Sequence, residues 1–457
     1  MKLIQQSPFT PPKLRGVFYG WWLVGISGLV MTLATVPLFH AMSVWAVALE
    51  QHFHWSRGEL GLALTFTRIE GGIMGPIEGY LTDKLGARRM VLIGLLILGV
   101  GFVLLSQVHS LFTFYAAFMV MALGQGLGSW LPLMTTLNQW FAKRRAMAMG
   151  WSNVGSRLGA LLLVPAIAWA VAPEYDRLGG LVSFASASWQ LTAMALGALV
   201  LILAVPLSSL IRNRPQDYGQ YPDGIDPTSQ LMAVAGSETQ APSSAAQDYR
   251  STDLTASQAI RTSAFWFIAI GHGFTSMIIL AIFAHLGLLL QDYGYDVQTT
   301  GWVVTVYTAV AMVFQLVGGY VGDRMPKRIA LFIFTSIQAA GVLVLTVSSI
   351  LPMFYGFAVL FGMGFGGRNP LTTAIRGEYF GRASFGKILG LSTVPMNVLL
   401  LVASPFAGYM RDIQGSYSTA FLVLGILNFL GGVLFLMAKN PVPFVATPAP
   451  TTANESG

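Results

Sequence analysis

Four ionisable side chains lie deep inside long apolar stretches of the sequence: Arg68, Glu70, Arg157 and Arg368. With a rise of about 1.5 Å per helical residue, the three arginines fall roughly 15–22 Å from the nearest charged loop, close to the middle of a bilayer. An ionisable group at the bilayer centre costs at least about 2.5–3.5 kcal/mol on insertion scales, so each of these side chains must face protein or water.

Three of these deep groups are cations and one is an anion, which favours an anionic ligand. A guanidinium group can hold a carboxylate through two parallel hydrogen bonds. Arg368 is the leading candidate, because it follows the glycine-rich run 362–367 and precedes Asn369 and Pro370, where a helix can pack closely or unwind. The alternative is structural: the arginines pair with Glu70 or with helix carbonyl groups.

Glu70 and His285 are the candidate proton carriers. Glu70 can carry a proton if burial keeps its carboxyl group protonated, and histidine titrates near neutral pH. The alternatives are a static ion pair for Glu70 and a hydrogen-bonded packing histidine for His285. Arg68 lies about 200° round the helix from Glu70, so the partner of Glu70 is expected on another helix.

The sequence shows no pattern for a metal site, a cofactor or catalysis. It contains no cysteine, no zinc-binding spacing and no nucleophile–His–acid set. The glycine-rich run 124–129 lies within an apolar span and indicates helix packing, not a phosphate loop. We therefore expect no metal, no cofactor, no catalytic residue and no enzymatic activity.

Composition indicates the elements that hold these residues. Charged residues make up 10% of the chain and hydrophobic residues 54%, whereas soluble domains average about 25% charged. We predict an all-α polytopic membrane protein in the lipid bilayer, since a span needs about 20 mostly apolar residues. Twelve stretches qualify: 18–42, 57–80, 89–109, 111–137, 146–171, 188–211, 263–290, 299–321, 328–349, 351–377, 386–410 and 416–438.

The distribution of Lys and Arg predicts the orientation. Of 26 such residues, 20 fall on the side that holds both termini, and three on the other side, Arg57, Arg177 and Arg411. The positive-inside rule places both termini in the cytoplasm. Loop charge also accounts for most of the net charge of +7, so no nucleic-acid partner is expected.

Residues 213–262 differ from both flanks, being rich in Pro, Gly, Ser, Ala, Gln and Asp. We predict a cytoplasmic linker here. The domains are then an N-terminal six-helix half at 1–212, the linker, a C-terminal six-helix half at 263–440 and a disordered cytoplasmic tail at 441–457.

An internal repeat relates the halves. The run G-Y-L-T-D-K-L-G-A-R-R at 79–89 returns 240 positions later as G-Y-V-G-D-R-M-P-K-R at 319–328. Two homologous halves are typical of transporters built around a midplane site. The residues expected to act in conformational change are Gly79, Asp83, Lys84, Arg88 and Arg89 in the first copy and Asp323 and Arg324 in the second.

These residues resemble the major facilitator superfamily, whose loop between helices 2 and 3 reads G-x-L-x-D-[KR]-x-G-[RK]-[RK]. The resemblance covers about 15–440 and implies that helix 10 lines a central cavity. Helices 2 and 5 would then flank it, where Arg68 and Arg157 could equally act as gates. It also implies that Asp83 forms a cytoplasmic latch and that Gly79 packs helix 2 against helix 11. Pro326, in the place of Gly86, suggests a weaker latch on the second half.

A finer resemblance is to the bacterial monocarboxylate-transporter-like and oxalate/formate-antiporter-like branch. It rests on Y-G-W-W-L-V (19–24), W-F-A-K-R-R-A-M-A-M-G (140–150) and H-L-G-L-L-L-Q-D-Y-G (285–294). Mammalian monocarboxylate transporters carry an Asp and an Arg in helix 8. Because 299–321 has neither, their substrate site is not carried over.

The predicted function is secondary active transport of a small organic anion, monocarboxylate-like, by alternating access across a bacterial inner (plasma) membrane. Coupling to a proton is preferred over exchange for a counter-anion, because protonatable groups are available. One alternative is a carrier for a neutral or amphipathic substrate with purely structural arginines. Another is a non-transporting sensor or a membrane enzyme.

Overall fold

The computed structural model describes residues 18–55, 59, 73–171, 189–225, 253–295 and 297–441. The described residues contain no strand. The first bundle consists of α1 (Tyr19–Thr35), π-helix η1 (Val36–His40), α2 (Met42–Phe53), a helix at 73–85, α4 (Ala87–Ser106), α5 (Leu111–Gly128), α6 (Trp130–Trp140), α7 (Arg145–Val171) and α8 (Trp189–Ser209). The second bundle consists of α11 (Ser263–Asp292), α12 (Val297–Gly322), α13 (Lys327–Thr346), α14 (Leu351–Phe380), α15 (Phe385–Gln414) and α16 (Ser418–Met437).

Ten helical segments of the described chain are long and apolar enough to cross a membrane. The helix at 73–85 and α14 complete the twelve predicted segments. The all-α fold of two six-helix halves is therefore confirmed.

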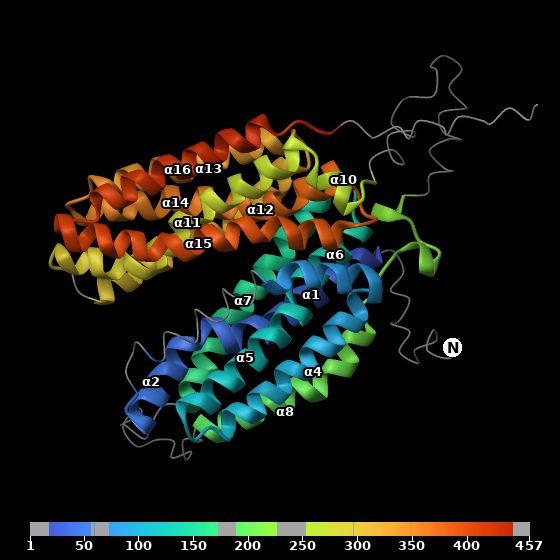
Figure 1. The fold of residues 1–457 in the computed structure, drawn as a ribbon, viewed down its shortest axis with the longest axis horizontal. Helices are drawn as coiled ribbons and strands as arrows, with labels where there is room; N and C mark the ends of the chain where they lie inside the picture. The colour runs from blue at the N-terminus through green and yellow to red at the C-terminus, as the bar shows by residue number, and fades with distance from the viewer. Residues whose placement is uncertain are drawn as a thin grey trace, which may run out of the picture.

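The two bundles meet at one end and diverge at the other (Figure 1). We call the first the converging end; α1 begins there, α16 ends there, and the short helices of the linker lie beside it. The second we call the open end. The two bundles are therefore arranged as a V (Figure 1).

Two helices of the first bundle are interrupted near their middle. Pro37 lacks a backbone N–H, and a π-helix replaces the α-helix at Val36–His40. The freed carbonyl of Pro37 accepts a hydrogen bond from Trp45 Nε1 at 2.8 Å. The chain also breaks at Ser129, between α5 and α6. The Ser129 hydroxyl lies 3.1 Å from that of Thr35, so the two breaks meet in a polar contact.

Both ends of the linker fold onto the bundles. The first end contains η2 (Gln216–Tyr218) and η3 (Pro222–Gly224), and the last contains α10 (Ala256–Ile260). Arg212 lies between the rings of Tyr19 and Tyr218, at 4.0 and 4.3 Å, and ties the first end to α1.

Candidate functional site

The deep charges predicted from sequence are only partly described. Arg68 and Glu70 lie outside the described residues, so their predicted roles stay predictions. Arg157, Arg368, Asn369 and His285 are described, and they lie in different environments.

Arg157 lies where the two bundles face each other. It is half-buried on α7 of the first bundle, and its guanidinium lies 5.2 Å from the ring centre of Phe365, on α14 of the second. Its charge also acts on His40 of η1 and on Tyr307 of α12. A cation–π contact of this kind contributes about 0.5–2 kcal/mol. Arg157 is thus a cation at the interface of the halves.

Arg368 lies inside the second bundle and is 2% exposed. Its Nε donates to Gln338 Oε1 on α13 at 2.9 Å, and its Nη2 donates to the Thr275 carbonyl on α11 at 3.0 Å. Asn369, the next residue, is half-buried on the same face of α14 as Phe365, one turn away. In this conformation Arg368 therefore points away from the space between the bundles.

Arg376 is a second fully buried arginine on α14. Its Nε donates to Ser392 Oγ at 2.7 Å, its Nη1 donates to the Thr372 carbonyl, and its Nη2 lies 3.3 Å from His272 Nδ1. Arg376 is one of the 20 Lys and Arg residues that the sequence analysis counted on the side of the termini. The helix in fact continues to Phe380, and the guanidinium turns into the bundle.

These arginines have neutral partners among the described residues. The ion pairs resolved there include Lys327–Glu378 and Arg411–Asp292, and none joins a carboxylate to Arg157, Arg368 or Arg376. A charge transferred from water into a bundle is costly unless it is neutralised. The described part of the site therefore carries an excess of positive charge.

His285 has hydrogen-bond partners on both ring nitrogens. Nε2 lies 3.0 Å from the Ser404 carbonyl oxygen, which can only accept, so Nε2 carries the hydrogen in the neutral ring. Nδ1 lies 3.3 Å from the Tyr417 hydroxyl. The Arg411–Asp292 pair, with bonds of 2.9 and 3.0 Å, lies nearby, at the open end.

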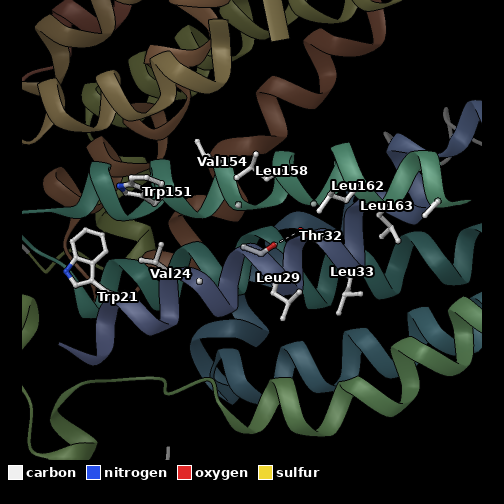
Figure 2. Close-up of a pocket in the computed structure, with 15 residues that line it drawn as sticks. Trp21, Val24, Leu29, Thr32, Leu33, Trp151, Val154, Leu158, Leu162 and Leu163 are labelled. Atoms are coloured by element: carbon white, nitrogen blue, oxygen red, sulfur yellow. Dashed lines mark hydrogen bonds between the residues drawn. The ribbon is translucent and has the colours of Figure 1, made fainter. Parts of the chain in front are cut away.

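A groove of about 830 Å³ runs between α1 and α7. Figure 2 shows Trp21 and Trp151 at one end and Leu29, Leu158 and Leu162 along its length. Its lining is mostly apolar and holds no charged residue, and the hydroxyl of Thr32 in it donates to the Gly28 carbonyl. It offers nothing to recognise an anion.

The repeated motifs join the bundles at the converging end. The Asp83 carboxylate accepts from the backbone N–H groups of Gly386 and Lys387, both at 2.9 Å. Asp323 accepts in the same way from Ala146 at 2.9 Å and Met147 at 3.0 Å. A weaker second latch was expected from Pro326, but the two pairs of bonds are alike, because Pro326 is the N-cap residue of α13 and leaves Asp323 in place.

Other motif residues secure the same end. Gly86 has a φ of +82°, and the Arg88 N–H donates to Asn213 Oδ1 at 2.9 Å. Lys84 Nζ lies 5.7 Å from the ring centre of Tyr80, and the Arg324 guanidinium lies 3.5 Å from that of Tyr320. Burial raises the pKa of Asp83 and of Asp323, and the backbone N–H groups offset part of that rise.

Two aspartates of the linker were missed by the sequence analysis. Asp223 accepts from the backbone of Ala142 and Lys143 at 2.9 and 2.8 Å. Asp253 accepts from the backbone N–H of Arg382 at 2.6 Å, at the corresponding turn of the second bundle. The available signal was that 140–150 and 379–390 are equivalent in the repeat. Both turns begin a helix with free N–H groups, which an acidic side chain can accept from.

The fold and the latches define an integral membrane protein of two pseudo-symmetric helical bundles that meet at one end. The chain belongs to the Major Facilitator Superfamily, whose family model matches residues 26–297 and 265–455. This is a family of transporters, not enzymes, as expected from the sequence.

Curated relatives and solved structures agree with this family. The chain is 23% identical to monocarboxylate transporter 13 of Rattus norvegicus over 92% of its own length and 89% of the relative. It is 24% identical to the agnestins efflux protein AgnL12 of Paecilomyces divaricatus over 79% of this chain and 74% of that one.

Among solved structures, the transporter FucP in the outward conformation matches with a TM-score of 0.65 at 12% identity, covering 92% of this chain and 99% of that one. The proton:xylose symporter XylE matches with a TM-score of 0.66 at 14% identity, covering 93% and 96%. At these identities the structures show the fold alone.

Proposed function

We propose that the chain moves a small, monocarboxylate-like organic anion across the membrane, coupled to a proton. The observation that supports this most is that Arg157, Arg368 and Arg376 have no carboxylate partner among the described residues. A bound anion would neutralise part of that charge. The names of the monocarboxylate transporters to which the chain is similar agree with this substrate class.

The proposed orientation sets the converging end in the cytoplasm, with both chain termini. The positive-inside rule supports it, because the motif loops that carry Lys84, Arg88 and Arg324 lie at this end. The open end then faces outward, and the membrane is the bacterial inner (plasma) membrane. Alternating access consists of breaking the Asp83 and Asp323 latches while the outer ends close.

Arg157 is the proposed first contact for the anion, since it lies half-buried between the bundles. Asn369 shares the face of α14 that carries Phe365 and can donate a hydrogen bond to the same ligand. Arg68 and Arg368 are proposed as further contacts or gates, and Glu70 and His285 as proton carriers.

The test is uptake into proteoliposomes of labelled monocarboxylates and dicarboxylates, with and without a pH gradient. We expect a monocarboxylate to be taken up faster when the outside is acidic. Arg157→Lys keeps the charge but loses the two-pronged donor, so its KM should rise about tenfold, as for a lost charge-assisted hydrogen bond. If no carboxylate is transported or competes, the anion proposal is wrong.

A second candidate is a carrier for a larger, less polar compound. The similarity to the agnestins efflux protein favours it. In that case neutral aromatic compounds would compete for transport, and Arg157→Gln would leave transport unchanged.

A further inference from the structure

His272, Arg376 and Ser392 bring three helices of the second bundle together. They come from α11, α14 and α15, in that order. A guanidinium group only donates hydrogen bonds, so His272 Nδ1, at 3.3 Å from Arg376 Nη2, must present its lone pair. The imidazole is therefore neutral and carries its hydrogen on Nε2.

The charged groups that act on His272 are Arg376 and Arg368, both on α14. A proton on Nδ1 would remove the acceptor of Arg376 and place two cations side by side. A carboxylate that took over as the acceptor of Nη2–H would neutralise Arg376 and release Nδ1. Anion binding and protonation would then favour each other, which is the thermodynamic form of coupling.

The cluster lies directly behind the surface where the bundles touch. Gly377 follows Arg376, and a Cβ on it would lie 1.9 Å from Asn138 Oδ1 of α6. Thr393 follows Ser392, and its Oγ1 lies 3.1 Å from a Cβ placed on Gly75 of the 73–85 helix. Both contacts are with the first bundle, so the residues that follow Arg376 and Ser392 belong to the contact that separates when the converging end opens.

We propose that Arg376, His272 and Ser392 form an anion- and proton-binding site that becomes accessible when the converging end opens. The inference rests on the proposed function and names the residues that couple the two ions. The carboxylate accepts from the Arg376 guanidinium and the Ser392 hydroxyl. His272 Nδ1 takes a proton from water, forming an N–H bond as an O–H bond of hydronium breaks, and a monocarboxylate and a proton cross with no net charge.

The first test is His272→Gln, which keeps a neutral hydrogen-bond acceptor for Arg376 but takes up no proton. A one-to-one symporter accumulates its anion about tenfold under a gradient of one pH unit. We expect His272→Gln to lose this accumulation while retaining exchange of labelled for unlabelled anion at equal pH. His109→Gln, at an exposed position between α4 and α5, is the matched control and should accumulate normally.

The second test uses sidedness. Arg376→Lys should raise KM about tenfold for anion presented at the converging end, as for a lost charge-assisted hydrogen bond, and leave KM at the open end unchanged. Right-side-out and inside-out vesicles separate the two sides.

Normal accumulation by His272→Gln would overturn the inference and leave the proposed function standing. Absence of carboxylate transport in the unmodified protein would instead refute the proposed function itself. If His272→Gln loses exchange as well, the sidedness of Arg376→Lys decides: an effect equal on both sides, or none, overturns the site.

Discussion

Asp83 of the first bundle holds Gly386 of the second, through a 2.9 Å hydrogen bond from the glycine N–H to the aspartate carboxylate. The same carboxylate accepts from Lys387, so one side chain satisfies two donors at the start of α15. A negative charge at a helix N-terminus is also favourable to the helix dipole. Closure of the converging end therefore depends on a small number of identifiable bonds.

Asp83→Asn should loosen this end. The amide keeps the size but has only one accepting oxygen, so one of the N–H groups of Gly386 and Lys387 loses its acceptor, at a cost of about 0.5–1.5 kcal/mol. Because the chain contains no cysteine, a thiol introduced at buried Thr136 would report the change. We expect its labelling by a reagent added on the side of the converging end to become about fivefold faster, corresponding to roughly 1 kcal/mol. Asp412→Asn, exposed near the open end, should leave the rate unchanged.

Acidification should favour the closed converging end. Burial raises the pKa of Asp83 and Asp323 there, so the closed state binds protons more tightly than a state with both carboxyl groups in water. The closed state is then most favoured below the ordinary aspartate pKa and loses stability as pH rises through the raised value. Spin labels at positions 89 and 324 would follow this change. A closed fraction that instead grew with rising pH would contradict the prediction.

Gly79→Ala should prevent closure. A Cβ at Gly79 would lie 2.2 Å from the Gly386 carbonyl oxygen, a backbone atom that has little freedom to move. Overpacking of this kind costs about 1–3 kcal/mol, so net transport should fall at least severalfold with normal insertion. Gly25→Ala, where a Cβ would meet nothing within 4 Å, is the matched control. Equal activity of the two variants would disprove the close contact.

Asp223→Ala should destabilise the first bundle without weakening substrate binding. The side chain supplies acceptors to Ala142 and Lys143, and loss of such a cap costs about 0.5–2 kcal/mol. We expect a lower midpoint of thermal unfolding in detergent and an unchanged KM. Asp217→Ala, at an exposed position on the same segment, is the control and should leave the midpoint of unfolding unchanged. A similar loss of stability in this variant would contradict the capping role of Asp223.

Apolar periodicity and the internal repeat were sufficient to predict the architecture from the sequence. Apolar length identified the spans, and the paired motifs predicted Asp83 and Asp323 as equivalent residues; both make similar hydrogen bonds to the opposite bundle. The contact of Gly79 with Gly386, expected from the family resemblance, is also present.

The site was harder to predict, because depth along a helix does not say which way a side chain points. Arg157 and Arg368 have similar predicted depths, yet one faces the other bundle and the other faces Gln338 and Thr275 within its own. Arg376 was counted with the loop charges for the same reason, because such a count does not consider the direction in which a side chain points. Which neighbouring helix a side chain meets depends on how the helices pack, and the position of the residue in the sequence does not determine this.

The reciprocity of the two latches has a consequence for the origin of the molecule. Asp83 reaches the second bundle at Gly386 and Asp323 reaches the first at Ala146, as in an isologous contact where residue i meets j and j meets i. A two-fold dimer of a single six-helix ancestor would have made both bonds from one aspartate. Fusion into one chain releases each copy to change alone, and the exchange of Gly86 for Pro326 is such a change.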